Sequence, residues 1–141
     1  MARAFPLAGL LRLRHSQEDQ AAAALAAANT SSRDAKARRQ SVRIEASMTE
    51  SEPVSLAALS AIAAARASSR SMLADLDVLC QIRDEAAITA QSEFMAARTR
   101  SVGLEKLSDR HHTEWTAGQM KAEQGALDEI ASSRQLRTQG V

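Results

Sequence analysis

Few residues in this chain could carry chemistry, and the best cluster is His111 and His112 with Glu114. Two metal ligands on one helix need a spacing of four residues, but His111 meets Trp115 there and His112 meets Thr116. A structural zinc site takes four His or Cys ligands, and no distant set completes this pair. We therefore expect no metal site, with His111 at a helix interface and His112 in solvent.

Cys80 is the single cysteine, so no intramolecular disulfide can form. A buried cysteine behaves as a small apolar residue, and no histidine lies near it in sequence to activate the thiol. The chain also lacks a glycine-rich phosphate loop and the Ser/His/Asp order of a catalytic triad. We expect Cys80 to fill a core position, and we expect a protein that is not an enzyme and has no cofactor or small-molecule substrate.

A basic stretch is the candidate for binding nucleic acid. It consists of Arg33, Lys36, Arg38, Arg39 and Arg43, and Asp34 and Glu45 balance it in part. Aromatic residues for base stacking are absent nearby, and the formal net charge of +1 gives no general attraction to polyanions. We favour a solvated helix face with an Asp34–Arg38 ion pair over a nucleic-acid site, and we expect no nucleic-acid partner.

The composition favours long helices over a thick core. The 141 residues include 30 alanines but only five glycines and two prolines, and Phe5, Phe94 and Trp115 are the only aromatic residues. Alanine has the highest helix propensity but buries little apolar area. No stretch approaches the roughly 20 apolar residues of a membrane span.

One break divides the chain into two expected helices within a single domain, residues 1–141. The first covers about residues 6–50, with Pro6 at its first position. The break at residues 51–55 contains Pro53. Ser55 is a candidate N-cap for the helix that follows.

The second expected helix covers about residues 56–134, and residues 135–141 should fray. Its segment 67–71 is rich in serine and could kink or interrupt the helix.

Residues at alternating steps of three and four predict an interface along each helix. The first seam is Leu7, Leu11, Arg14, Glu18, Ala21, Leu25, Ala28, Ser32, Ala35, Arg39, Val42 and Ala46. The second is Leu73, Leu76, Cys80, Arg83, Ala87, Ala90, Phe94, Ala97, Ser101 and Leu104, and continues weakly through His111, Trp115 and Ala122. We predict an all-α fold: two long helices forming an antiparallel coiled-coil hairpin, the second helix longer.

The longer second helix must leave part of its length without a helical partner. There the residues Ala122, Leu127 and Ile130 suggest a docking stripe with a polar rim of Glu123, Gln124, Asp128 and Glu129. The same acidic residues could equally serve only to solvate the helix. Sequence alone leaves both interpretations open.

Both ends of the chain resemble the flagellar export protein FliJ family. The motifs are residues 5–14 (FPLAGLLRLR) with Glu18-Asp19-Gln20-Ala21 and Leu25-Ala26, then residues 103–107 (GLEKL), Arg110, Glu123-Gln124 and residues 127–131 (LDEIA). Their order and spacing span nearly the whole chain. This chain is richer in Ala and Ser than typical members.

The resemblance implies a cytoplasmic component of the flagellar type III export apparatus, peripherally associated with the membrane at the flagellar base. Such a protein binds the export ATPase ring and the membrane export-gate protein, and escorts export chaperones. Candidate partner-binding residues are Lys106, Arg110, Glu123, Gln124, Leu127, Asp128 and Glu129. The alternative is a generic cytoplasmic coiled-coil scaffold or chaperone that homodimerises and is unrelated to flagella.

Overall fold

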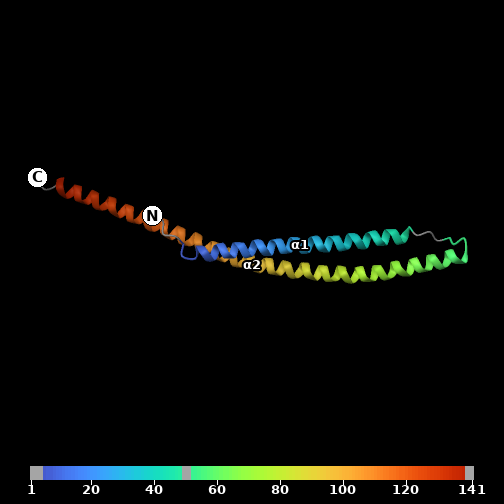
Figure 1. The fold of residues 1–141 in the computed structure, drawn as a ribbon. Coiled ribbons are helices and arrows are strands. Elements are labelled where there is room, and N and C mark those ends of the chain that lie inside the picture. The colour runs from blue at the N-terminus through green and yellow to red at the C-terminus, as the bar shows by residue number, and fades with distance from the viewer. Residues whose placement is uncertain (1–4, 49–51, 139–141) are drawn as a thin grey trace. The chain divides into compact units, whose positions relative to one another are not determined.

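The computed structural model describes the chain over residues 5–48 and 52–138. These ranges hold two α-helices, α1 over Ala8–Ser47 and α2 over Leu56–Thr138, of 40 and 83 residues. No strand occurs in the described ranges. The predicted all-α fold, a helical hairpin whose second helix is longer, is confirmed (Figure 1).

The helix ends follow local chain chemistry. Pro6 lies in a turn before α1, where the Ala8 N–H donates to the Phe5 carbonyl at 3.0 Å, so α1 begins two residues after its expected start. Ser55 caps α2 as expected, because its Oγ accepts a hydrogen bond from the Ala58 N–H at 3.1 Å. The expected end of the first helix near residue 50 lies outside the described residues.

Helix α2 is continuous where the sequence suggests weakness. Residues 67–71 are α-helical, since this segment contains neither Gly nor Pro and follows an alanine-rich run. The helix also continues through Thr138, beyond the expected fraying point at residue 135, and residues 139–141 lie outside the described ranges.

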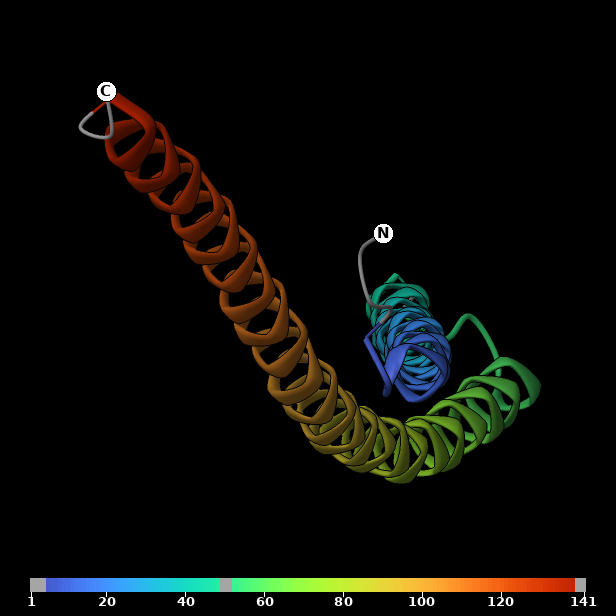
Figure 2. The ribbon, with the colours of Figure 1, turned by 90° about the vertical axis from the view of Figure 1, so that its left-hand side faces the viewer.

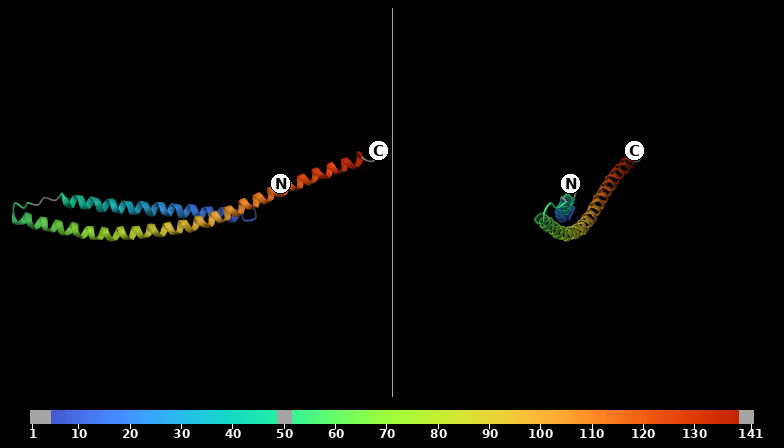
Figure 3. Two further views of the ribbon diagram at one scale, coloured as in Figure 1. Left: turned by 180° about the vertical axis from the view of Figure 1, so that it is seen from behind. Right: turned by 90° about the vertical axis from the view of Figure 1, so that its right-hand side faces the viewer.

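The hairpin forms two compact units, and both helices contribute to each. Among the described residues, the central unit lies within residues 17–97, and the terminal unit combines residues 5–16 with 98–138. In the central unit α1 and α2 lie side by side (Figure 3). Lys36 pairs with Asp84 and Arg39 pairs with Asp77, so α2 runs backward as α1 runs forward. The helices are antiparallel.

Small side chains make up most of the buried seam. The buried residues are Ser32, Ala35, Leu76, Cys80, Ala90, Ala97 and Ser101. Cys80 is 3% exposed, which agrees with the expected role as core filler. Because alanine and serine are short, the two backbones can pack closely, but each layer removes little apolar area from water.

The predicted seams agree with the observed burial at most positions. In the first seam only Leu7 is exposed, at 41%, and the other predicted residues are buried or half-buried. On α2 the prediction fails at Arg83, which is exposed. Ala122, expected on the part of the helix without a helical partner, is exposed as well. Arg83 lies at the edge of the seam, where it lines a shallow cavity with Asp34 and Arg38 of α1.

Asp84 joins the two helices of the central unit through two side chains of α1. Its Oδ1 lies 2.8 Å from Lys36 Nζ and accepts a hydrogen bond from Ser32 Oγ at 2.5 Å. The Lys36 contact, and then the Ser32 hydrogen bond, lower the pKa of the Asp84 carboxyl below its ordinary value, against a smaller opposing effect of burial. This cluster favours one register of α1 against α2, because a shift by one residue would break both contacts.

The terminal unit has its own cross-helix contacts. His15 Nε2 of α1 lies 2.8 Å from Glu105 Oε1 of α2. Within α2, Arg98 Nη1 lies 3.8 Å from the same oxygen. The rings of Phe5 and His111 pack at a centroid distance of 5.6 Å. His111 is half-buried and His112 is exposed, as expected. These contacts hold the start of α1 against α2 up to about His111.

Neither described helix is apolar over a stretch long enough to cross a bilayer.

The small seam residues make the packing sensitive to added volume. Ala90→Leu should lower the free energy of unfolding by about 1–3 kcal/mol, because Ala90 is 9% exposed and a larger side chain must displace α1. Ala86→Leu is the matched control, since Ala86 is exposed on the same helix. Chemical denaturation followed by circular dichroism measures both variants. Equal stability of the two variants would contradict the described seam.

The Asp84 cluster predicts a pH-dependent contribution to stability. Because the pKa of the folded state lies below the unfolded value, near the ordinary 3.8, folding favours the ionised form and the contribution is complete above that value. It is lost as pH falls below 3.8 through the folded pKa. The wild type should therefore be more stable than Asp84→Asn at pH 7, with the difference shrinking in acid and in high salt.

The control for this titration is Asp75→Asn, an exposed aspartate on the same helix. Denaturation midpoints across the pH range should change little for this variant. A stability difference between wild type and Asp84→Asn that stays constant into acid would show that the carboxyl's charge plays no part.

Candidate partner-binding surface

The main candidate site is the part of α2 that continues past the start of α1. We call residues 116–138 the C-terminal extension. Trp115 is the last half-buried residue before it, and every residue of 116–135 is exposed. No second helix lies beside this segment, drawn in orange to red in Figures 1 and 2. Because its side chains are exposed over residues 116–135, the extension leaves its surface open to a partner.

Three large apolar side chains are exposed on the extension. Met120 and Leu127 are each 66% exposed and Ile130 is 51% exposed. Met120 and Leu127 lie seven residues apart, and Ile130 follows three later, so the three share one face of the helix. We call Met120, Leu127 and Ile130 the apolar stripe.

The apolar stripe differs from the sequence prediction at one position. The sequence predicts Ala122 in it, but Ala122 and Leu127 are five residues apart and point about 140° away from each other around the helix. The prediction extends the seam step by step from Trp115, which leads to Ala122 and misses Met120. The heptad spacing of Met120 and Leu127 is the sequence signal for the face that these two exposed residues share.

The seven predicted partner-binding residues are all exposed, but they do not form one patch. Lys106 and Arg110 precede the extension, and Arg110 Nε pairs with Glu114 Oε1 at 2.9 Å. The other five lie on the extension. Glu129 follows Leu127 by two residues and so lies on another side of the helix.

Glu123, Gln124 and Asp128 border the apolar stripe. Glu123 and Gln124 precede Leu127 by four and three residues, which places them beside it on the helix surface. Asp128 lies on one edge, a heptad after Lys121. Among the predicted residues, this group with Leu127 is the set that the helix brings together.

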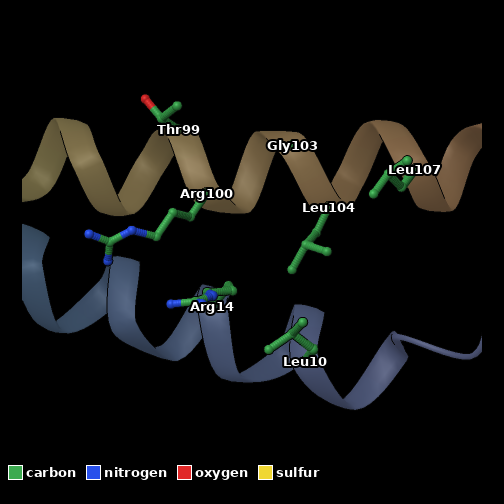
Figure 4. Close-up of a pocket in the computed structure, with 7 residues that line it drawn as sticks. All are labelled: Leu10, Arg14, Thr99, Arg100, Gly103, Leu104 and Leu107. Atoms are coloured by element: carbon green, nitrogen blue, oxygen red, sulfur yellow. The ribbon is translucent and has the colours of Figure 1, made fainter.

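A shallow groove in the terminal unit is a second candidate surface. Its volume is about 330 Å³, and its lining residues are Leu10, Arg14, Thr99, Arg100, Gly103, Leu104 and Leu107. Figure 4 shows Leu10 and Leu104 on facing helices, with Arg14 and Arg100 toward one end. A Cβ at Gly103 would meet no atom within 4 Å, so the groove is open at that point. An aliphatic side chain next to a carboxylate would match this lining.

Sequence reasoning misses this groove because it forms between residues about 90 positions apart. Leu10 and Leu107 are 38% and 49% exposed, whereas an interface position would bury them. Only the register of the hairpin brings them to the same groove.

The basic stretch of α1 is largely engaged within the central unit. Lys36 and Arg39 face Asp84 and Asp77 across the hairpin at 2.8 and 3.0 Å. The expected Asp34–Arg38 ion pair is wrong: these two side chains border a shallow cavity with Arg83 and form no ion pair within the described chain. Two of the five basic residues of this stretch thus pair with acidic residues of α2.

Within the described ranges, no three His, Cys, Asp or Glu side chains come together as a metal site would require.

Comparison with known proteins gives one result. The sequence model of the family described as "Flagellar FliJ protein" matches residues 3–140. No curated protein and no solved structure matches the chain. The family match removes the alternative of a scaffold unrelated to flagella. Because the match covers almost the entire sequence, this chain belongs to the flagellar FliJ family.

Proposed function

We propose that this protein is a non-enzymatic adaptor of the flagellar type III export apparatus, which binds the export ATPase ring and the membrane export gate. Family membership implies a component of flagellar export. The finer roles are our proposal: promoting substrate export as a general chaperone, assisting export chaperones, and working peripherally at the membrane of the flagellar base.

The observation that best supports this proposal is the exposed C-terminal extension. The apolar stripe is exposed, and it lies on the part of α2 that continues past α1 in the described structure. An amphipathic helix of this kind binds by laying its apolar face into a groove or ring of another protein. Two or three anchors at heptad-related spacing are typical of such contacts.

The described surface also fits a binding role better than a catalytic one. Catalytic sites need convergent polar groups in a concave pocket that excludes water. The groove beside Leu104 is shallow, with a volume of about 330 Å³. It combines aliphatic residues with two arginines, which suits a peptide segment.

Pull-down and rate measurements with the export ATPase test the proposal. The wild-type chain should bind the ATPase and change its rate of ATP hydrolysis. The double variant Met120→Asp and Leu127→Asp should weaken binding at least about tenfold, because each loses an apolar anchor worth more than about 1 kcal/mol.

The matched control is Ile88→Asp, which changes an isoleucine that is 70% exposed in the central unit. This variant should bind like the wild type. Absence of binding by the wild-type chain, with no effect on the hydrolysis rate, would overturn the adaptor role. If the double variant binds the ATPase as tightly as the wild type does, the ATPase binds a surface other than the extension.

A further inference from the structure

We propose that the C-terminal extension pairs with the extension of a second copy of this chain, as an antiparallel two-helix coiled coil. The inference is independent of the proposed function, because it concerns a contact of the chain with itself. It rests on the apolar face of the extension and on the signs of the charges that border that face.

The extension carries a short heptad pattern of its own. Ala117, Met120, Gln124, Leu127 and Ala131 follow one another at steps of three, four, three and four residues. This spacing is that of the core positions of a coiled coil. All five are exposed, so α1 does not already occupy this face. Ile130 lies beside the core line and widens the apolar face.

The charges at the border decide the orientation. Lys121 and Asp128 each follow a core residue of the d type, Met120 and Leu127, so they occupy equivalent border positions one heptad apart. Neither charged group has an ion-pair partner within the described part of the chain. Glu123 lies on the other border, directly before Gln124.

In an antiparallel pair, equivalent borders of the two helices face each other. If Leu127 lies beside Gln124 of the second copy, Met120 lies beside Ala131 of the second copy. Lys121 then faces Asp128 of the second copy, and by symmetry the same pair forms a second time. The register that places Met120 beside Ala131 and Leu127 beside the aliphatic part of Gln124 therefore also joins both Lys121–Asp128 pairs.

A parallel pair would have the opposite electrostatics. Opposite borders then face each other, and Glu123 would face Asp128 of the second copy in both halves. Two carboxylate pairs would repel, and Lys121 would face Thr116 instead. The charge pattern thus favours the antiparallel arrangement by attraction and disfavours the parallel one by repulsion.

The contact should be weak and reversible. Two heptads with Met120 and Leu127 as the larger core residues bury less than the roughly 1,200 Å² at which standard stable interfaces begin. Such a dimer forms at high local concentration and separates on dilution. It would cover the apolar stripe until another partner displaces it.

Sedimentation equilibrium of the full chain, from a few to several hundred micromolar, tests the proposal. The wild type should show a concentration-dependent monomer–dimer equilibrium. Lys121→Asp and Asp128→Lys should each weaken the dimer about tenfold, because each turns two attractive pairs into two repulsive ones. The double variant with both changes should return to near wild-type affinity, since it swaps the charges.

Two controls separate this result from general effects of charge or folding. Arg43→Asp reverses an exposed charge on α1, and Ile88→Asp places a charge on α2 outside the extension; both should dimerise like the wild type. Circular dichroism should show the same helicity for every variant.

A wild type that stays monomeric throughout would overturn the proposal. So would a double variant without recovery, or an Asp128→Lys variant that dimerises more tightly, which the parallel arrangement predicts. The sedimentation experiment contains no ATPase. A negative result would therefore overturn the proposed dimer without bearing on the adaptor role.

Discussion

The structure depends on a seam of small side chains between two antiparallel helices. Alanine, serine and cysteine at positions such as Ala35, Cys80 and Ala90 let the backbones pack closely, but they bury little apolar area. Polar contacts at the edges of the seam therefore carry much of the specificity. Ser32 and Lys36 meet Asp84 in the central unit, and His15 meets Glu105 in the terminal unit. The Lys36–Asp84 and His15–Glu105 pairs are about half exposed, so each adds little stability but distinguishes one register from its neighbours.

The same seam accounts for the location of the candidate binding surface. The segment just before α1 reaches α2 at His111, where the ring of Phe5 packs on the imidazole. Beyond Trp115 the helix keeps its α-helical backbone, and every residue of 116–135 is exposed. The apolar residues in that segment, Met120 and Leu127 above all, have no role in the hairpin itself. Binding another chain, either an export component or a second copy, would account for these exposed residues.

Much of the fold could be predicted from the sequence, because the relevant signals are local. Pro53 and Ser55 mark the break and the cap of α2, and steps of three and four residues trace the seam on both helices. The errors arise where tertiary contacts decide between equivalent local options. Asp34 and Arg38 have the spacing of an ion pair, but they do not form one in the described structure. The neighbouring Lys36 and Arg39 pair with Asp84 and Asp77 of α2. Similarly, Asp84 contacts Ser32 and Lys36 of α1, whereas the predicted seam residue Arg83 is exposed. For the candidate site, the sequence predicts a stripe of Ala122, Leu127 and Ile130, whereas the large apolar residues on one exposed face are Met120, Leu127 and Ile130. Nothing local in the sequence shows where α1 stops covering α2.

The central claim is that α1 stabilises α2 only up to about Trp115. Amide hydrogen exchange of the free chain at low micromolar concentration, read by mass spectrometry or NMR, tests it most directly. Amides of α2 around Leu76 to Ala97 should be strongly protected, because their helix is packed against α1. Amides after residue 116 should exchange many-fold faster, since a single exposed helix opens readily. Equal protection from Leu76 through residue 135 in the monomer would contradict this account.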